Sequence, residues 1–330
     1  MEKIIVTGSC GFIGFNYIKS LDENHEIIGI DSLNNAYDPK LKELRLEQLR
    51  KISNFKFLKI DLSQQSEIEK NKKYLEGAKT IVHLGARAGV RQSYLEPEKY
   101  IRDNTSATVN LALTAKNLGI KNIILASTSS IYGDTGNNQA TENKDELSEP
   151  PSIYAATKGF GETLIKSVFS EESELLKIGR FFTVYGPYGR PDMSILRFVH
   201  WIATNEEVII YGDGQQRRSF TYVMDIVDGL NRLKQYNKSD TFNFGSNTTW
   251  SLIEIVNKIE NYLGKKANLV FKERAFRDVD VVLPNLNNSK DKLDWEPLTN
   301  IDEGLKKTID WYKNNESYLE KIKFKYDYEK

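Results

Sequence analysis

The stretch VTGSCGFIG, residues 6–14, decides the fold of this 330-residue chain. Its glycines, Gly8, Gly11 and Gly14, follow a short apolar run and open a segment with helical spacing. In that context glycines allow a tight turn and let backbone N–H groups approach a pyrophosphate at the positive end of a helix. The spacing therefore predicts a dinucleotide-binding loop, with Phe12 and Ile13 beside the glycines at the cofactor.

Asp31 supports this interpretation because it ends the next apolar run, seventeen residues after Gly14. A carboxylate at the end of the second strand accepts hydrogen bonds from the adenosine ribose hydroxyls. The same carboxylate repels a 2′-phosphate. The sequence therefore favours NAD over NADP.

Short apolar runs alternate with segments of helical spacing in the first half of the chain. Strands are predicted at 3–7, 26–30, 55–60, 80–84, 122–127 and 174–181, and helices at 12–21, 40–49, 100–118 and 152–170. This alternation is typical of an α/β protein with a doubly wound parallel sheet, the Rossmann fold. We therefore expect ligand sites at the carboxyl ends of the strands.

The pattern becomes irregular after about residue 181. The Gly- and Pro-rich segment VYGPYGRPDM (184–193) predicts a loop, and it is followed by a predicted helix at 194–204, a strand at 207–212 and a helix at 251–263. We expect residues 1–180 to form the NAD-binding domain, with later segments interleaved. Residues 181–330 are expected to form mainly a smaller lobe that closes over the sheet.

Composition excludes several classes of protein. Lys plus Arg and Asp plus Glu both number 46, so nothing suggests a nucleic-acid partner. The only cysteine, Cys10, rules out an intrachain disulfide, and no apolar run approaches the roughly 18 residues that span a bilayer. We expect a cytoplasmic protein without a signal peptide, and we expect KIKFKYDYEK (321–330) to be a solvated tail.

A second pattern carries chemistry. LASTSSIYG (125–133) ends the fifth predicted strand with four hydroxyl side chains, and YAATK (154–158) lies on the helix that follows. A spacing of four places Tyr154 and Lys158 on one helix face. Tyrosine has a pKa near 10, so we expect the Lys158 ammonium, helped by a positive nicotinamide ring, to lower the pKa of Tyr154.

Together these elements resemble the extended short-chain dehydrogenase/reductases that act on nucleotide sugars. The resemblance covers residues 1 to about 300 and is closest to the UDP-glucuronate 4-epimerases. It rests on GIDSLNNAYDPKLKELRLEQL (29–49), HLGARAGVRQSYLEPEKYIRDN (83–104) and, above all, RFFTVYGPYGRPDM (180–193).

The resemblance implies roles for the catalytic and cofactor residues. Tyr154 would be the general base, Lys158 its electrostatic partner that also bonds the nicotinamide ribose, and Thr128 a hydrogen-bonding partner of the sugar 4-oxygen. The remaining residues implied at the cofactor are Asp61 and Leu62 beside the adenine, Leu84 and Ala86 in the segment after the fourth strand, and Asn104 supporting the sheet near the nicotinamide. His83 is expected to be structural.

The resemblance also implies a set of residues that bind the UDP-sugar substrate. Tyr211 would pack on the uracil, and Arg218 and either Arg274 or Arg277, with Arg277 preferred, would bind the diphosphate. The candidates to hold a sugar carboxylate are Thr183, Arg190, Ser129 and Ser130, although Arg190 is also suited to a salt bridge that steadies its own loop.

Two residues and one segment depart from the family pattern; the segment is ERAFRDVDV (273–281), which stands where an Arg-x-Gly-Asp motif is usual. Arg87 stands where a glutamine is usual, which would put an extra positive charge near the cofactor or substrate. Ser219 replaces an aspartate that usually follows the diphosphate arginine. These departures bear on the substrate more than on the fold or the cofactor.

The resemblance implies an NAD-dependent 4-epimerase that works through a transient 4-keto sugar, with UDP-glucuronate as substrate and UDP-galacturonate as product. One alternative is a 4-epimerase of a neutral UDP-sugar, such as UDP-glucose or an N-acetyl relative. A second is a 4,6-dehydratase or a decarboxylase, which the plain serines 129 and 130 disfavour because those relatives carry acids there. A third, a non-catalytic NAD sensor, is disfavoured because Thr128, Tyr154 and Lys158 are all present.

The resemblance also implies a homodimer that pairs through the helices at about 100–118 and 152–170. Polysaccharide biosynthesis is the pathway that such sugars suggest. The sequence implies no metal, nucleic-acid or membrane partner.

Overall fold

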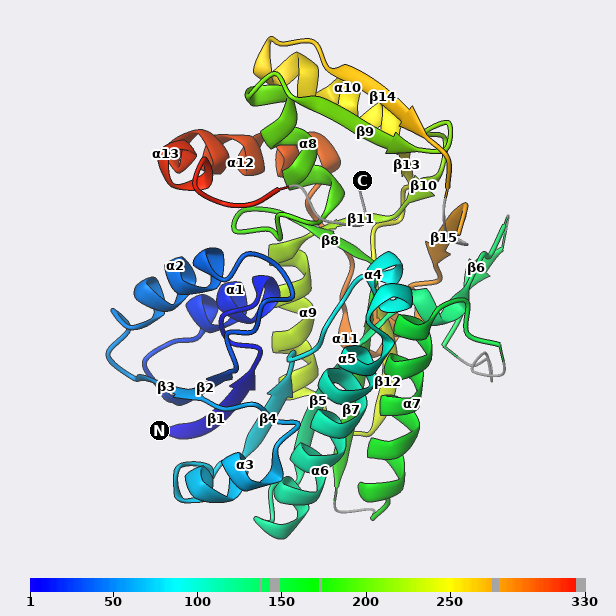
Figure 1. The fold of residues 1–330 in the computed structure, drawn as a ribbon. Coiled ribbons are helices and arrows are strands. Elements are labelled where there is room, and N and C mark those ends of the chain that lie inside the picture. The colour runs from blue at the N-terminus through cyan, green and yellow to red at the C-terminus, as the bar shows by residue number, and fades with distance from the viewer. Residues whose placement is uncertain (137, 143–148, 172–173, 275–278, 325–330) are drawn as a thin grey trace.

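The computed structural model describes residues 1–136, 138–142, 149–171, 174–274 and 279–324. Its centre is a parallel sheet of seven strands in the order β12-β7-β5-β4-β1-β2-β3 (Figure 1). The strands are β1 (Glu2–Thr7), β2 (His25–Asp31), β3 (Phe55–Lys59), β4 (Thr80–His83), β5 (Asn122–Thr128), β7 (Leu175–Phe181) and β12 (Asp240–Phe244). The predicted doubly wound fold is confirmed.

Successive side chains of β1 pack on opposite faces of the sheet, and both faces are covered. Ile4 and Val6 pack into one apolar cluster and Ile5 into another, and all three are fully buried. The first cluster lies under α1 (Phe12–Ser20), α2 (Lys40–Leu49) and α9 (Val223–Gln235), and the second under α3 (Gln65–Asn71), α6 (Ala107–Asn117) and α7 (Ile153–Val168). A strand that is buried on both faces has to be apolar throughout, as the sequence pattern indicated.

The strand order reverses between β1 and β4, so their carboxyl ends separate and leave a crevice. The predicted helix at 100–118 is not one regular helix. It consists of α5 (Pro97–Tyr100), a π-helix, η2 (Ile101–Ser106), and α6. The wider π-turn lies beside this crevice, a place where such turns are often found in functional sites.

A second group of elements lies beyond the carboxyl ends of the sheet (Figure 1). There β9 (Glu207–Tyr211) pairs with β14 (Asn268–Lys272), and α8 (Ser194–Ala203), α10 (Leu252–Leu263) and α12 (Ile301–Asn314) pack together. Short strands between the two groups are β8 (Thr183–Tyr185) with β11 (Phe220–Tyr222), and β13 (Trp250–Ser251), β10 (Arg217–Arg218), β15 (Val281–Pro284) and β6 (Gln139–Ala140). The other short elements are η1 (Lys72–Tyr74), α4 (Val90–Leu95), η3 (Ser129–Tyr132), α11 (Asn287–Leu293) and α13 (Glu316–Leu319).

The prediction of a solvated tail is wrong for residues 321–324, the part of it that the structure describes. Ile322 and Phe324 are buried, and the Phe324 ring stacks on His200 with 3.7 Å between centroids. The Lys323 backbone N–H donates to Asp38 at 2.9 Å. Tertiary packing therefore overrides the charged composition of this segment.

None of the helices that the structure describes is long and apolar enough to cross a membrane. Nor do the described residues contain a group of three or more His, Cys, Asp or Glu side chains that could hold a metal ion.

Lys177 on β7 is a buried charge, and it generates a stability prediction. Its side chain donates to Asn122 Oδ1 at 2.6 Å, and burial lowers the pKa of Lys177 to about 8. The unfolded chain therefore binds more protons between that value and the ordinary lysine pKa, so wild-type stability should rise with pH in this window. We expect Lys177→Met to raise the free energy of unfolding at pH 7 by about 1 to 3 kcal/mol.

Chemical unfolding between about pH 7 and 10 tests this prediction, because the advantage of the variant should shrink as pH rises through the folded-state pKa. Lys79→Met, at an exposed lysine before β4, is the control. Equal stability of Lys177→Met and wild type at pH 7 would contradict the prediction.

Candidate active site

A cleft of about 480 Å³ lies between the carboxyl ends of the sheet and the second group of elements. It is lined by nearly all the residues predicted for the site: Gly8, Gly11, Phe12, Ile13, Gly14, Asp31, Asp61, Leu62, Leu84, Ala86, Thr128, Ser129, Ser130, Tyr154, Lys158, Thr183, Arg190, Tyr211 and Arg218. Asn104 lies behind the cleft wall, and Arg277 falls outside the described residues. Residues far apart in the sequence are thus brought to one cavity.

The glycine loop has the geometry that a pyrophosphate requires. Gly8 has φ +65, and a Cβ at Gly14 would lie 2.2 Å from the Gly8 carbonyl oxygen. A Cβ at Gly8 would lie 2.8 Å from the backbone of Leu84. No side chain fits at either position, so the loop keeps its backbone bare at the start of α1. These residues fit a dinucleotide.

Asp31 is fixed by its neighbours. Its Oδ2 accepts from the Cys10 N–H at 3.1 Å, and its Oδ1 accepts from the Leu33 N–H at 2.8 Å. The ammonium of the buried Lys42 lies 3.8 Å away. The carboxylate therefore stays at the edge of the cleft, where ribose hydroxyls can donate to it.

Asp61 and Leu62 follow β3 and line the same end of the cleft. Asp61 Oδ1 accepts from both the backbone N–H and the hydroxyl of Ser63, at 3.0 and 2.7 Å. These bonds close the turn, and they leave Leu62 as an apolar surface of the kind on which an adenine can pack.

Asn104 supports the loop after β4 from the π-helix. Its Oδ1 accepts from the Arg87 N–H at 2.6 Å, and its Nδ2 donates to the Arg87 carbonyl at 3.0 Å and to Thr157 Oγ1 at 3.0 Å. The side chain is thus bonded to both the β4 loop and α7. His83 has a similar role, because its two ring nitrogens contact Thr7 and Thr108 at 2.6 and 3.0 Å.

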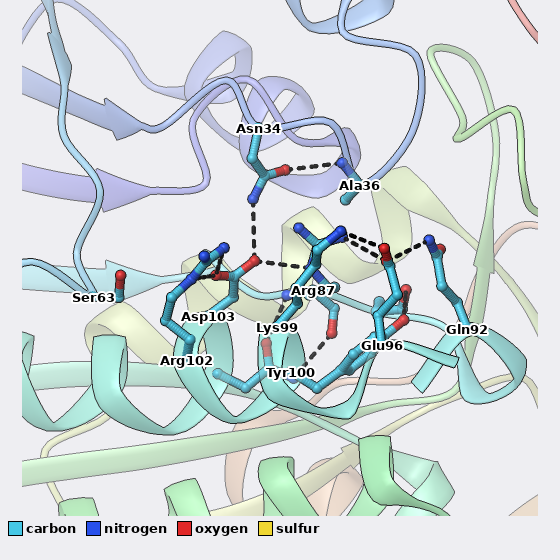
Figure 2. A network of polar contacts seen from close by, with 12 residues as sticks. Asn34, Ala36, Ser63, Arg87, Gln92, Glu96, Lys99, Tyr100, Arg102 and Asp103 are labelled. Carbon is cyan, nitrogen blue, oxygen red and sulfur yellow. Dashed lines mark hydrogen bonds and ion pairs between the residues drawn. The ribbon is translucent and has the colours of Figure 1, made fainter. Parts of the chain in front are cut away.

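Figure 2 shows where the unusual Arg87 lies. Its Nε donates to Asp103 at 2.8 Å, and its Nη1 is 3.8 Å from Glu96, while Asp103 also pairs with Arg102 at 2.8 Å. Asn34, in the loop after β2, donates to Asp103 at 3.5 Å. The extra positive charge of Arg87 is therefore paired with Asp103, which lines the cleft, and with Glu96, which is not among the lining residues.

Tyr154 and Lys158 share the face of α7 that borders the cleft, and Ser152 caps this helix by accepting from the Ala155 N–H. The expectation that Lys158 and a bound nicotinamide ring together lower the pKa of Tyr154 stays a prediction, because it depends on the bound cofactor. Burial raises the pKa of Tyr154, and the groups that oppose this shift are the Thr128 hydroxyl and Arg190. In the protein without cofactor, burial therefore disfavours the phenolate form of Tyr154.

Burial lowers the pKa of Lys158 to about 8, although Glu162, one turn further along α7, acts in the opposite direction. The lysine also contributes to lowering the pKa of His83, so the two groups are close. A lysine with this pKa is mostly protonated at neutral pH, so Lys158 carries positive charge at the cleft.

The four hydroxyls at the end of β5 have different surroundings. Ser127 bonds the buried Glu162, which also pairs with Arg180 at 2.9 Å, so Ser127 belongs to the scaffold. Thr128 Oγ1 accepts from the Ser130 N–H and donates to the Ser130 hydroxyl, both at 3.1 Å. This network directs Thr128 toward Tyr154 and leaves Ser129 in the cleft wall.

Arg190 is paired within its own loop. Its Nε and Nη2 donate to the two oxygens of Asp192 at 3.0 and 2.5 Å, and Nη2 also donates to the Ala88 carbonyl at 3.1 Å. The hydrogen bonds that Arg190 makes to described residues come from Nε and Nη2. The bidentate edge of the guanidinium is thus occupied, and Nη1 is the group left to meet a ligand.

Tyr211 and Arg218, which are predicted to bind the uracil and the diphosphate, line the far end of the cleft. The guanidinium of Arg91 lies 4.0 Å from the Tyr211 ring centroid. Arg218 donates to the carbonyls of Arg217 and Asp280 at 2.8 and 3.2 Å. Arg274 pairs with Asp280 at 2.6 Å and is not among the residues that line the cleft.

The Ser219 substitution has a local explanation. Its hydroxyl donates to the Ser246 carbonyl at 2.9 Å and accepts from the Ser246 N–H at 2.7 Å. These two bonds tie β10 to the loop after β12, with no charge at this position.

Sequence reasoning missed several lining residues, among them the cationic side chains Lys42, Arg91 and Arg197. Lys42 and Arg91 lie inside stretches that carried the family resemblance, but nothing in the local pattern separates them from surface charges. Arg197 is on an amphipathic helix, α8, where its burial could be recognised only from the tertiary structure.

Comparisons with known proteins agree with this geometry. The model of the NAD dependent epimerase/dehydratase family matches residues 4–245. An uncharacterized protein of Methanocaldococcus jannaschii is 40% identical, over 96% of this chain and 98% of its own length. The UDP-glucuronate 4-epimerase of Thermodesulfobacterium geofontis is 39% identical, over 98% of this chain and 100% of its own length.

Among solved structures, the UDP-glucuronic acid 4-epimerase of Bacillus cereus in complex with UDP-glucuronic acid and NAD superposes with a TM-score of 0.88. It is 29% identical, and the match covers 94% of this chain and 99% of that one. The glycine loop, Asp31 and the residues around Tyr154 all lie within the part matched by the family model. The chain belongs to the NAD-dependent epimerase/dehydratase family.

Proposed function

We propose that this protein is an NAD-dependent 4-epimerase that converts UDP-glucuronate to UDP-galacturonate and back. The observation that carries the proposal is the joint presence, in one cleft, of a dinucleotide loop with Asp31 and of Thr128, Tyr154 and Lys158. Residues 1–180, with β12 and α9 returning to the sheet, would bind NAD. Residues 181–330 would mainly bind the UDP-sugar.

The proposed chemistry begins with removal of the proton from the sugar 4-hydroxyl. When bound, NAD supplies a reversible acceptor for the C4 hydrogen and its electron pair. Tyr154 takes the hydroxyl proton, Thr128 holds the same oxygen by a hydrogen bond, and Lys158 stabilises the phenolate. The 4-keto sugar turns within the cleft, the hydrogen returns to the other face of C4, and Tyr154 gives back its proton.

The serines beside Thr128 argue against elimination. A dehydratase must protonate the departing 6-hydroxyl, and Ser129 and Ser130 are far too weakly acidic to do so. Because Thr128 fixes Ser130 through two bonds, this pair is suited to hold a ligand oxygen. Reversible oxidation at C4 is therefore the chemistry that the cleft supports.

A 4-keto uronic acid is a β-keto acid, and it loses carbon dioxide when the carboxylate bond aligns with the carbonyl π system. The bond from C5 to the carboxylate breaks, its electron pair forms an enolate with C4, and C5 then takes a proton. An epimerase has to prevent this alignment with fixed hydrogen bonds. We propose that Ser129, Ser130, Thr183 and the Nη1 of Arg190 do so.

A second candidate is a 4-epimerase of a neutral UDP-sugar. The observation that favours it is the pairing of Arg190 with Asp192, because this ion pair offers a substrate carboxylate little net positive charge. The fold and the catalytic groups would be unchanged, so only the sugar distinguishes the two candidates.

We also propose a homodimer, working in the cytoplasm on precursors for polysaccharide synthesis. Exposed apolar side chains gather on α4, η2, α6 and α7, where Leu95, Ile101, Leu113 and Phe160 are each about half exposed. These helices pack side by side. A matching face on a second copy would bury this apolar surface.

The decisive test is to incubate the purified protein with UDP-glucuronate and follow the products by NMR. We expect UDP-galacturonate without added cofactor, because the NAD is regenerated in each cycle and stays bound. A UDP-pentose as the main product would indicate a decarboxylase. Interconversion of UDP-glucose and UDP-galactose without turnover of UDP-glucuronate would leave the second candidate.

Tyr154→Phe is the matched control for this assay. We expect it to bind NAD and the UDP-sugar but to turn over about 100-fold to 10,000-fold more slowly, since it lacks the general base. Unchanged turnover would remove Tyr154 from the mechanism.

Arg190→Ala tests the proposed contact with the carboxylate. We expect a higher KM for UDP-glucuronate and a larger fraction of decarboxylated product, because the variant loses Nη1 and leaves Asp192 unpaired near the sugar. The measurement is the ratio of decarboxylated products to UDP-galacturonate, by NMR with NAD added. The decarboxylated products are UDP-4-keto-pentose, whose release leaves the cofactor reduced, and UDP-pentose, whose formation returns the hydride.

Asp192→Asn separates this role from support of the loop. It keeps the Arg190 charge and removes the competing carboxylate, so we expect KM for UDP-glucuronate to fall or stay constant. If both variants lose activity equally with an unchanged product ratio, Arg190 serves only its own loop.

The dimer prediction is tested with Phe160→Asp on α7. We expect a monomer by light scattering, because a charge at the centre of the apolar face opposes its burial. Leu298→Asp, at an exposed leucine outside these helices, should leave the assembly unchanged. A wild-type monomer would refute the proposed homodimer.

A further inference from the structure

Arg45 is a buried cation outside the catalytic group, and the proposed mechanism does not use it. It lies on α2, and its side chain is among the largest that are fully buried. It is not among the residues that line the cleft, so it is not placed to touch a ligand there.

All four hydrogen bonds of Arg45 go to neutral oxygens. Its Nη1 donates to the Cys10 carbonyl at 2.9 Å and to the Tyr37 hydroxyl at 2.6 Å. Its Nη2 donates to the carbonyls of Tyr188 and Gly189 at 2.6 and 3.0 Å. A single guanidinium therefore joins three segments of the chain.

Each of these segments borders a different part of the cleft. Cys10 lies inside the glycine loop, Tyr37 lies in the segment between Asp31 and α2, and Gly189 directly precedes Arg190. The Tyr37 ring is also 5.2 Å from the Arg190 guanidinium. Arg45 is thus a direct physical link between the cofactor loop and the loop that carries Arg190, beside the contacts of Asn16 with Pro187 and of Phe15 with Tyr188.

The link is stiff, because a buried charge needs all its partners. Moving either loop away would remove acceptors from one of the two Nη groups in a dry environment, which is far more costly than losing an exposed bond. Tyr188 also has φ +60, a conformation that is unfavourable for a tyrosine and that neighbouring contacts have to maintain. Its carbonyl bond to Arg45 is one of these contacts.

We propose that Arg45 is a positioning residue that sets the distance between the glycine loop and the Arg190 loop. In doing so it fixes the sugar carboxylate relative to the nicotinamide and keeps the 4-keto intermediate from losing carbon dioxide. The second statement rests on the proposed function. The first rests on the geometry alone.

The variants are Arg45→Met, which keeps the bulk of the side chain and removes every donor, and Arg45→Lys, which keeps the charge but not the planar fork. Arg50→Met, an exposed arginine just after α2, is the matched control. One measurement is hydrogen exchange of the segment 186–193 in the NAD-bound protein. The other is kcat, KM and the fraction of decarboxylated product with UDP-glucuronate.

We expect faster exchange at 186–193 in Arg45→Met and, to a smaller extent, in Arg45→Lys, with no change in Arg50→Met. Epimerisation by Arg45→Met should fall about tenfold or more, because a displacement of about 1 Å in a reacting group is enough for such a loss. The decarboxylated fraction should rise. A variant that was merely less stable would lose both products in proportion.

The two proposals fail in different ways. Wild-type epimerisation with unchanged exchange and product ratio in Arg45→Met would overturn the role of Arg45 and leave the function intact. Wild-type protein that does not use UDP-glucuronate, with faster loop exchange in the variants, would overturn the function and retain the link between the loops. If Arg45→Met does not fold, Arg45→Lys decides by the same criteria.

Discussion

The close approach of the chain to itself at the glycine loop is the constraint on which the rest of this molecule depends. The Gly8 carbonyl lies where a Cβ of residue 14 would be, and Gly8 itself packs against the backbone after β4. This contact fixes where α1 starts relative to β1 and β4, the two strands between which the order of the sheet reverses. The crevice, the position of Asp31 and the direction of α1 all follow from it.

Much of the fold could be predicted because its signals are local. The predicted strands and most of the predicted helices lie within a few residues of those observed, since apolar strands and helical spacing are properties of short segments. The prediction did not include β12 and α9. Strand β12 joins the main sheet by pairing with β7, and α9 packs on the sheet beside α1. No local pattern encodes these contacts. The burial of Phe324 against His200 escaped prediction for the same reason.

The candidate site also combines features that local motifs predict with features that only the tertiary structure shows. The glycine loop, Asp31, Thr128, Tyr154 and Lys158 occur in motifs whose spacing carries chemistry, and the structure brings them into one cleft. What the sequence could not give was the charge environment. At Tyr154, burial outweighs the Thr128 hydroxyl and the Arg190 charge. Asp103 and Glu96 pair with Arg87, and Arg45 bonds oxygens from segments more than a hundred residues apart. These are effects of packing.

The ion pair between Arg190 and Asp192 has one more consequence. Asp192 occupies the guanidinium edge that a uronate would otherwise take, so the protein carries an internal mimic of the acidic group of its proposed substrate. A tethered carboxylate competes at high effective concentration. Recognition of a sugar acid then depends on the difference in free energy between two similar contacts of Arg190, one with Asp192 and one with the sugar carboxylate. Selectivity for acidic over neutral sugars would accordingly be graded, and residue 192 would be the position through which it changes most readily.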